Sequence, residues 1–196
     1  MSHLLVCSLF LFLINVSSAK WDNKLEIAVN LNSLIRKVLA NGELYHSPKT
    51  GIAYTGWIKE FHNNGSVKVL SQLKDGLKDG FITFWNINGL RIIEGHYVKG
   101  KREGTWTMWF DDGGSTIAEY LNGKLHGESS SFYTTGNIAT IGKYLNGKKT
   151  GVWFDYNDAG LKFRETHYKK ETEIRLEKYF NDDGRLWRSA TYLDDK

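Results

Sequence analysis

The feature that most constrains this chain is a period of 23 or 24 residues in its glycines. Sixteen of the 20 glycines fall on three ladders that share this period. The first ladder comprises Gly42, Gly65, Gly89, Gly113, Gly136, Gly160 and Gly184. The second comprises Gly56, Gly80, Gly104, Gly127 and Gly151, and the third Gly76, Gly100, Gly123 and Gly147. Such a period indicates a stack of repeated supersecondary units.

Other residue classes repeat in the same register. An aromatic residue follows each glycine of the second ladder by five positions, at Phe61, Trp85, Trp109, Phe132 and Tyr156. Tyrosine recurs at Tyr97, Tyr120, Tyr144, Tyr168 and Tyr192. Two positions before each tyrosine stands a small residue, at Gly95, Ala118, Gly142, Thr166 and Ala190. The period therefore belongs to a whole structural unit and not to glycine alone.

One unit has the pattern of a β-hairpin. Residues 80–85 are short, aromatic and bounded by turn residues, which is typical of a strand. Residues 86–89 are the hairpin tip, 91–97 the return strand, and 98–104 the turn into the next unit. The glycine that closes each tip suits a left-handed backbone. We therefore predict structural turn roles for Gly65, Gly89, Gly113, Gly136, Gly160 and Gly184.

Stacked hairpins predict an all-β fold, an elongated and twisted antiparallel sheet. Each hairpin must extend its neighbour, because it cannot bury its faces alone. The strand at 104–110 places Trp106 and Met108 on one face and Trp109 on the other. The small residue before each tyrosine is expected to leave room for an aromatic side chain from the next unit.

The two ends of the repeat array look different from its middle. Residues 20–41 are apolar enough to form an N-terminal cap, with a short helix and one strand before Gly42. The repeats are predicted to occupy residues 42–193. Their last unit, 175–193, is degenerate, because Arg175 stands where the second ladder expects glycine. Both ends are expected to protect the sheet edges.

The turn motifs resemble the MORN repeat, a β-hairpin unit of about this period. The segment 120–127 reads YLNGKLHG and 144–151 reads YLNGKKTG, close to the repeat's Y-x-x-G-K-x-x-G core. The arm WTMWFDDG at 106–113 looks like a bacterial variant of the repeat that is called the YwqK-type antitoxin family. The resemblance covers roughly residues 34–193. It implies the hairpin fold and a role in binding.

The amino terminus is similar to a secretory signal peptide. An apolar run at 4–16 is followed by Ser17, Ser18 and Ala19, which places small residues at −3 and −1 of a cut after Ala19. We predict cleavage of residues 1–19 and export to a periplasmic or secreted location. An uncleaved anchor or a buried helix is the alternative. The mature chain would lack cysteine, because Cys7 lies within the apolar run.

The sequence indicates no catalytic, cofactor-binding or metal-ligating residues. A single cysteine excludes disulfide-stapled, zinc-ribbon and iron–sulfur classes, and a single proline excludes collagen. No histidine pair has the spacing of a metal-binding helix. His96 and His167 occupy equivalent repeat positions and could bind something together, although repetition alone explains them. We expect a protein that is not an enzyme and needs no cofactor.

Charge differs between the two kinds of turn. The inter-repeat turns 74–79, 98–103, 121–126, 145–150 and 169–175 sum to +6. The hairpin tips 60–66, 86–90, 110–115, 132–137, 155–160 and 180–185 sum to −6. Hairpins stacked in register would give one basic edge and one acidic edge. The candidate binding edge comprises Lys99, Lys101, Arg102, Lys124, Lys148 and Lys149.

A second candidate surface is an aromatic face that comprises Trp85, Trp109 and Tyr156. Uncovered aromatic side chains would suit a protein partner, a second copy of the chain included. The favoured hypothesis is an exported module that mediates protein–protein interaction. The alternatives are an envelope-surface module that binds anionic lipid, and an immunity-like protein that neutralises a toxin. The net charge of +4 is too small to favour nucleic acid.

Overall fold

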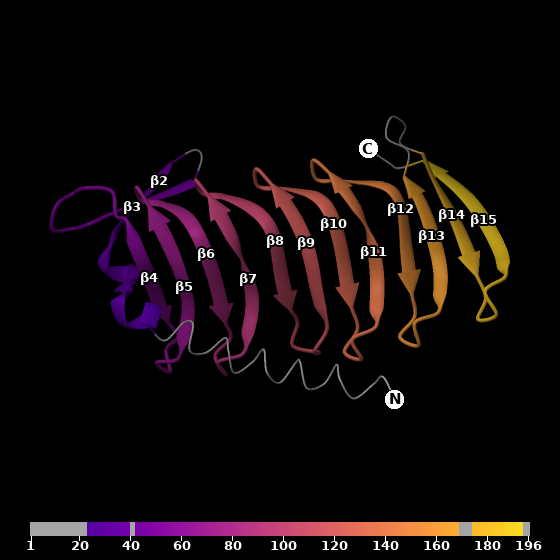
Figure 1. Ribbon diagram of the computed structural model, residues 1–196, viewed down its shortest axis with the longest axis horizontal. Helices are drawn as coiled ribbons and strands as arrows, with labels where there is room; N and C mark the ends of the chain where they lie inside the picture. The colour runs from indigo at the N-terminus through magenta and orange to yellow at the C-terminus, as the bar shows by residue number, and fades with distance from the viewer. Residues whose placement is uncertain (1–22, 40–41, 169–173, 194–196) are drawn as a thin grey trace.

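The computed structural model describes residues 23–39, 42–168 and 174–193 (Figure 1). The predicted signal peptide, 1–19, lies outside these residues. Thirteen strands form one sheet in sequential order from β4 to β15, with β1 beside β4, and a separate β2–β3 hairpin lies at the N-terminal end. All pairs in the large sheet are antiparallel except β1 with β4. The predicted all-β ladder of stacked hairpins is confirmed.

The strands of the ladder are seven to nine residues long, apart from β4. Their bounds are β4 Gly56–Phe61, β5 Val67–Lys74, β6 Leu77–Trp85, β7 Arg91–Val98, β8 Lys101–Trp109, β9 Ser115–Leu121, β10 Lys124–Phe132, β11 Ile138–Leu145, β12 Lys148–Tyr156, β13 Lys162–Tyr168, β14 Ile174–Phe180 and β15 Leu186–Leu193. With neighbouring strands about 4.8 Å apart, the 13 strands span about 58 Å. The molecule is therefore a long sheet in which each strand from β5 to β15 pairs only with the strands that precede and follow it in the chain (Figure 1).

Two kinds of turn alternate along the chain and lie at opposite edges of the sheet (Figure 1). The hairpin tips close with a bond such as that from the Gly89 amide to the Asn86 carbonyl, 2.9 Å. Their glycines have φ between 78° and 90°, as predicted for Gly65, Gly89, Gly113, Gly136, Gly160 and Gly184. A left-handed backbone of this kind costs glycine nothing but strains a side chain.

The inter-repeat turns are shorter than the sequence predicts. Lys99 and Gly100 both have positive φ, 48° and 79°, which is the two-residue type I′ hairpin turn. The strand resumes at Lys101, so the expected turn over 98–104 is wrong. Gly104 instead lies inside β8, at a bulge between the pairs His96–Glu103 and Glu94–Thr107. The bulge inserts two residues, and φ of 65° at Gly104 accommodates the distortion.

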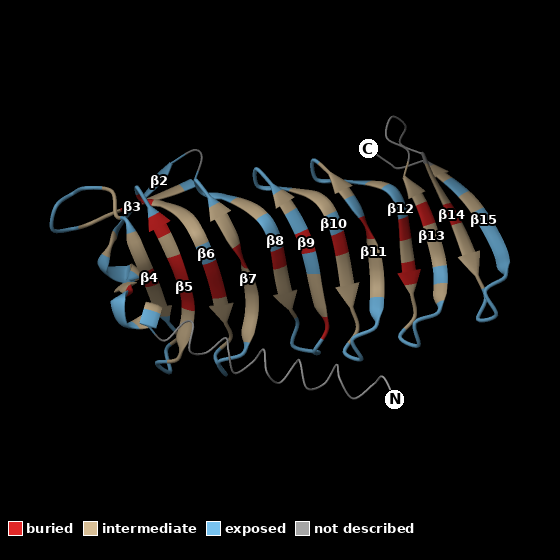
Figure 2. Ribbon diagram, viewed as in Figure 1, coloured by how far each residue is buried: buried red, intermediate tan, exposed pale blue. Residues whose placement is uncertain are grey.

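A central row of buried residues crosses the sheet from β4 to β14 (Figure 2), and their side chains share one face of it. We call this face the tryptophan face. Strand pairing aligns its central row in three runs, and the contacts of Gly95 with Trp106 and of Gly142 with Trp153 join them. The runs are Ile58, Ser71, Ile82 and Gly95; Trp106, Ala118, Ser129 and Gly142; and Trp153, Thr166, Glu177 and Ala190. Trp106 and Met108 share this face, while Trp109 lies on the opposite face, as the alternation predicts.

The central row pairs small residues with large ones. A Cβ at Gly95 would lie 2.2 Å from the ring of Trp106, and one at Gly142 would lie 2.1 Å from the ring of Trp153. These two glycines therefore leave room for the indole of the next unit, as expected. Ala118 differs, since its partner from the next unit is Ser129.

The N-terminal cap wraps around the first strand of the ladder. A short helical segment, 23–27, leads into β1 (Val29–Asn30), the 3₁₀ turn η1 (Leu31–Ser33), β2 (Ile35–Leu39) and β3 (Gly42–His46). The expected helix is present, but two strands rather than one precede Gly42. Tyr45 of β3 packs with Ile58 and Leu73 in a buried cluster on the tryptophan face. The degenerate last unit retains the hairpin as β14 and β15.

Candidate binding surfaces

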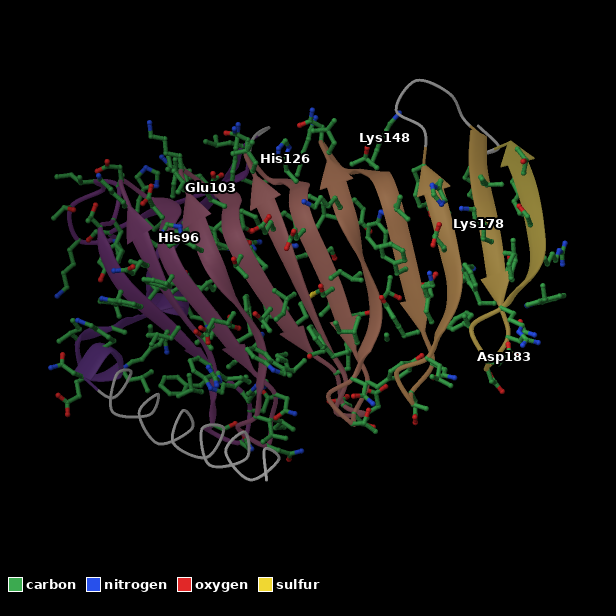
Figure 3. The ribbon with its side chains drawn as sticks, turned by 45° about the vertical axis from the view of Figure 1, so that its right-hand side comes forward. His96, Glu103, His126, Lys148, Lys178 and Asp183 are labelled. Carbon is green, nitrogen blue, oxygen red and sulfur yellow. The ribbon has the colours of Figure 1, made fainter. Side chains whose placement is uncertain are left out.

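Four of the predicted edge residues lie together at the type I′ turns. Lys99, Lys101, Lys124 and Lys148 are exposed and follow one edge of the sheet, which we call the lysine edge. Figure 3 shows Lys148 with Glu103 and His126 along this edge, while Asp183 lies at the opposite one. Successive turns are two strands apart, about 10 Å. Within the described residues none of the four ammonium groups forms an ion pair.

Hydrogen bonds between successive turns hold this edge in place. The Gly100 amide donates to the Lys78 carbonyl at 2.7 Å, and the Gly123 amide donates to the Arg102 carbonyl at 2.9 Å. A carboxylate of one unit also accepts from the next turn: Asp79 from the Lys99 amide at 3.0 Å, and Glu103 from the Asn122 amide at 2.9 Å. The backbone of the lysine edge is thus fixed from turn to turn.

Arg102 and Lys149 lie on the tryptophan face instead of the edge. The Arg102 guanidinium carbon lies 4.6 Å from the Trp106 ring centroid, and Nη1 donates to the Tyr120 hydroxyl at 3.1 Å. Lys149 Nζ lies 4.2 Å from the Trp153 centroid, and burial lowers the pKa of this amine. Both cations cover an indole, so their charges serve the ladder's own packing.

The predicted aromatic face is only partly uncovered. Trp85, Trp109 and Tyr156 are all half-buried at the tip ends of β6, β8 and β12. The Arg91 guanidinium carbon lies 5.2 Å from the Trp109 ring centroid. These three aromatics therefore offer part of each ring to a partner rather than a continuous stripe.

The sequence did not indicate a set of aliphatic side chains beside the lysine edge. Val98 and Leu121 are 39% and 42% exposed, and they pair across the turns with Lys101 and Lys124 on the face opposite the tryptophans. Leu145 and Lys148 form the third such pair. The signal was present as the residue after each tyrosine of the repeat, because strand alternation turns that residue to the other face.

A second group missed from the sequence is an ionic network in the last two units. Glu165 accepts hydrogen bonds from Lys162 at 3.1 Å and Lys178 at 3.2 Å, and its Oε1 lies 2.5 Å from His167 Nε2. Burial alone would raise the pKa of Glu165, but these hydrogen bonds lower it to about 2. The network is a structural ion cluster, and it gives His167 a partner within the fold.

His96 has a different environment, edge-on to Phe81 with ring centroids 5.3 Å apart. It lies on β7 while His167 lies on β13, so the sheet does not bring the two histidines together. In the part of the chain that the structure describes, no group of three or more histidine, cysteine or acidic side chains could hold a metal ion.

No helix among the described residues is long and apolar enough to cross a membrane. A scan of the chain against models of protein families found no match, and neither did a search of curated proteins.

Proposed function

We propose that this chain is a non-enzymatic MORN-type repeat module that binds another protein along the lysine edge. The observation that carries the proposal is the row of Lys99, Lys101, Lys124 and Lys148, exposed, held at a fixed spacing and without ion pairs among the described residues. The exposed side chains of Val98 and Leu121 beside it add apolar contact area.

This arrangement favours an acidic partner with a regular repeat of carboxylates. The spacing of about 10 Å matches residues seven apart on an α-helix, which rise about 10.5 Å. Opposite charge would steer the encounter and set the register, while the aliphatic pairs would supply burial. Neutralisation of a toxin would be one form of this binding. With the predicted signal peptide, the interaction would take place outside the cytoplasm.

Co-purification from producing cells tests the proposal. The edge variant replaces all four lysines by glutamine, and the control replaces Lys24, Lys37, Lys49 and Lys143, which gives the same change in net charge. We expect a stoichiometric acidic protein with the parent and the control, lost from the edge variant and at high salt. Equal recovery of that protein by both variants would contradict the proposal.

A second candidate is an anionic membrane surface, favoured by the alternation of lysine and aliphatic side chains along one edge. Sedimentation with neutral vesicles and with vesicles containing anionic lipid separates the two functions. Salt-sensitive binding to the anionic vesicles alone, lost in the edge variant, would support the membrane reading. Absence of vesicle binding would leave the protein partner as the remaining candidate.

A further inference from the structure

The two edges of the large sheet differ in whether another segment of the chain pairs with them. At the N-terminal end, β1 pairs with β4 through Val29–Ile58 and Asn30–Lys59, and Lys59 Nζ donates to the Leu25 carbonyl at 2.8 Å. At the C-terminal end, β15 pairs with β14 on one side, and no described residue pairs with its other side. Among the described residues, the protection that was expected at both edges is therefore present only at the N-terminal end.

The outer edge of β15 carries few of the usual devices against edge pairing. The strand is eight residues long, contains no proline and no lysine, and has Arg188 as its single charged residue. Leu186 and Trp187 are 55% and 62% exposed at its start. Unpaired backbone amides and carbonyls along such a strand are a template for another strand.

We propose that β15 pairs antiparallel with β15 of a second copy of this chain. A twofold axis normal to the sheet would continue the tryptophan face from one copy into the next. This symmetry requires paired residues to share a face. The pairing centred on Ala190 meets that condition and places Arg188 opposite Tyr192 of the other copy, and Ser189 opposite Thr191.

The contacts across this pairing repeat those already made within the ladder. A cation covers a tyrosine on the same face at Arg175 and Tyr192, 5.0 Å, and at Arg102 and Tyr120, 5.2 Å. The Arg188 guanidinium carbon already lies 5.7 Å from the Tyr179 ring centroid of its own chain, and in the pairing it would also meet the other copy's Tyr192. A pairing centred on Arg188 would instead set two like charges opposite each other, which is destabilising.

The capped N-terminal edge decides the form of the assembly. Head-to-tail stacking of copies would need an open edge at β4, but β1 already pairs with Ile58 and Lys59 in the middle of that edge. Pairing of β15 with itself uses the same surface on both copies and closes the assembly at two. A closed dimer of two copies therefore fits the two edges of the sheet, whereas an open-ended fibre does not.

Light scattering of the purified chain at about 100 µM tests the proposal, a concentration that populates a small interface. We expect the mass of a dimer. The double variant Ser189→Glu/Thr191→Glu sets glutamates opposite each other between copies and should weaken dimerisation more than tenfold. Ser189→Glu/Thr191→Lys restores opposite charges and should remain a dimer. Inside one copy Lys178 pairs with Ser189, so the glutamate has a favourable neighbour in both variants.

Far-UV circular dichroism tests whether both variants keep the fold, as we expect. A monomeric parent at this concentration would overturn the proposal, as would a dimeric Glu/Glu variant. If the Glu/Lys variant is a folded monomer, the pairing centred on Ala190 is wrong. A covalent check is Ala190→Cys with Cys7 replaced by serine, which should oxidise to a dimer, whereas Ala118→Cys in mid-sheet should not.

Discussion

Trp106 and Trp153 occupy the same position of the repeat, two units apart, yet their surroundings differ. Each indole lies over a glycine, is 3–4% exposed, and donates to a main-chain carbonyl at 3.1 Å. Trp106 belongs to an apolar cluster with Val69 and Ile82. Beside Trp153 the sheet buries charge instead, with Asp155 bonded to Arg164 at 2.7 Å and Glu177 bonded to Arg175 at 2.9 Å.

The comparison teaches that the repeat constrains volume more strongly than polarity. A large indole requires glycine in the preceding unit, at Gly95 and at Gly142. Around that pair the N-terminal half fills the rows with aliphatic side chains and the C-terminal half with ion pairs. Between them Ser129 occupies the indole position opposite Ala118, so neither packing scheme extends through the middle.

The largest effect should come from removing the indoles. Trp106→Ala should cost about 5 kcal/mol and Trp153→Ala about 3 kcal/mol, the limits usual for such truncations. The cavity at Trp106 would be dry, whereas Thr166 and Asp155 near Trp153 can bond to entering water. Urea denaturation measures both. Equal losses in the free energy of unfolding would show that the polar groups near Trp153 do not reduce the cost of the cavity.

Acid should weaken the C-terminal half first. The pKa of Glu165 is lowered to about 2 and that of Glu177 is also lowered, so their stabilisation is complete above pH 4.5 and disappears as the pH falls toward 2. Glu165→Gln should cost about 2 kcal/mol at pH 7 and flatten this fall. The exposed Glu128→Gln serves as control. An unchanged acid profile in Glu165→Gln would contradict the assignment.

The two cations that cover the indoles, Arg102 and Lys149, should differ in how much they stabilise the fold. Arg102→Leu should cost about 1–2 kcal/mol, because it removes a cation–π contact and a hydrogen bond to Tyr120. Lys149→Leu should change stability by less than about 0.5 kcal/mol, because burial already disfavours its charge. Leucine fits there, as Leu125 holds the equivalent position between them. Thermal unfolding of both variants gives the comparison, and a larger loss at Lys149 would reverse it.

The smallest effect concerns backbone strain at one turn. Lys99 has φ of 48° where the equivalent residues are Asp75, Asn122 and Asn146. Asparagine tolerates this region better than lysine, so Lys99→Asn should gain about 0.5 kcal/mol. The reciprocal Asn122→Lys should lose a similar amount, as measured by urea denaturation. A loss in Lys99→Asn would show that the lysine side chain stabilises its turn.

The fold could be predicted from the sequence because turns and volumes leave strong local signals. Gly89 and its equivalents predicted the hairpin tips, and Gly95 predicted the space that the Trp106 indole fills. The bulge at Gly104 could not be recognised, because the sequence does not distinguish a glycine in a bulge from a glycine in a turn. Only the structure shows that Lys99 and Gly100 form the whole turn, which leaves Gly104 inside the strand.

The candidate surface was predicted less well, because charge in a sequence does not show direction. Lys101 and Arg102 are neighbours in one turn segment, yet strand alternation sends only Arg102 over Trp106. Asp155 was counted as a tip charge, but it is 9% exposed and bonded to Arg164. Both errors arise because all the residues of one turn segment were assigned to a single surface. Counting positions from the tyrosine would have separated the faces.

The sequential strand order also determines how the molecule would bear load. The described ends lie at opposite ends of the sheet, so tension between them acts along the interstrand hydrogen bonds (Figure 1). Bonds loaded in this direction open one after another instead of resisting together. The ladder should therefore peel strand by strand at low force, in contrast to sheets pulled in shear. Hydrogen bonds between successive turns would oppose bending of the sheet, whereas tension between its two ends would lengthen it one strand at a time.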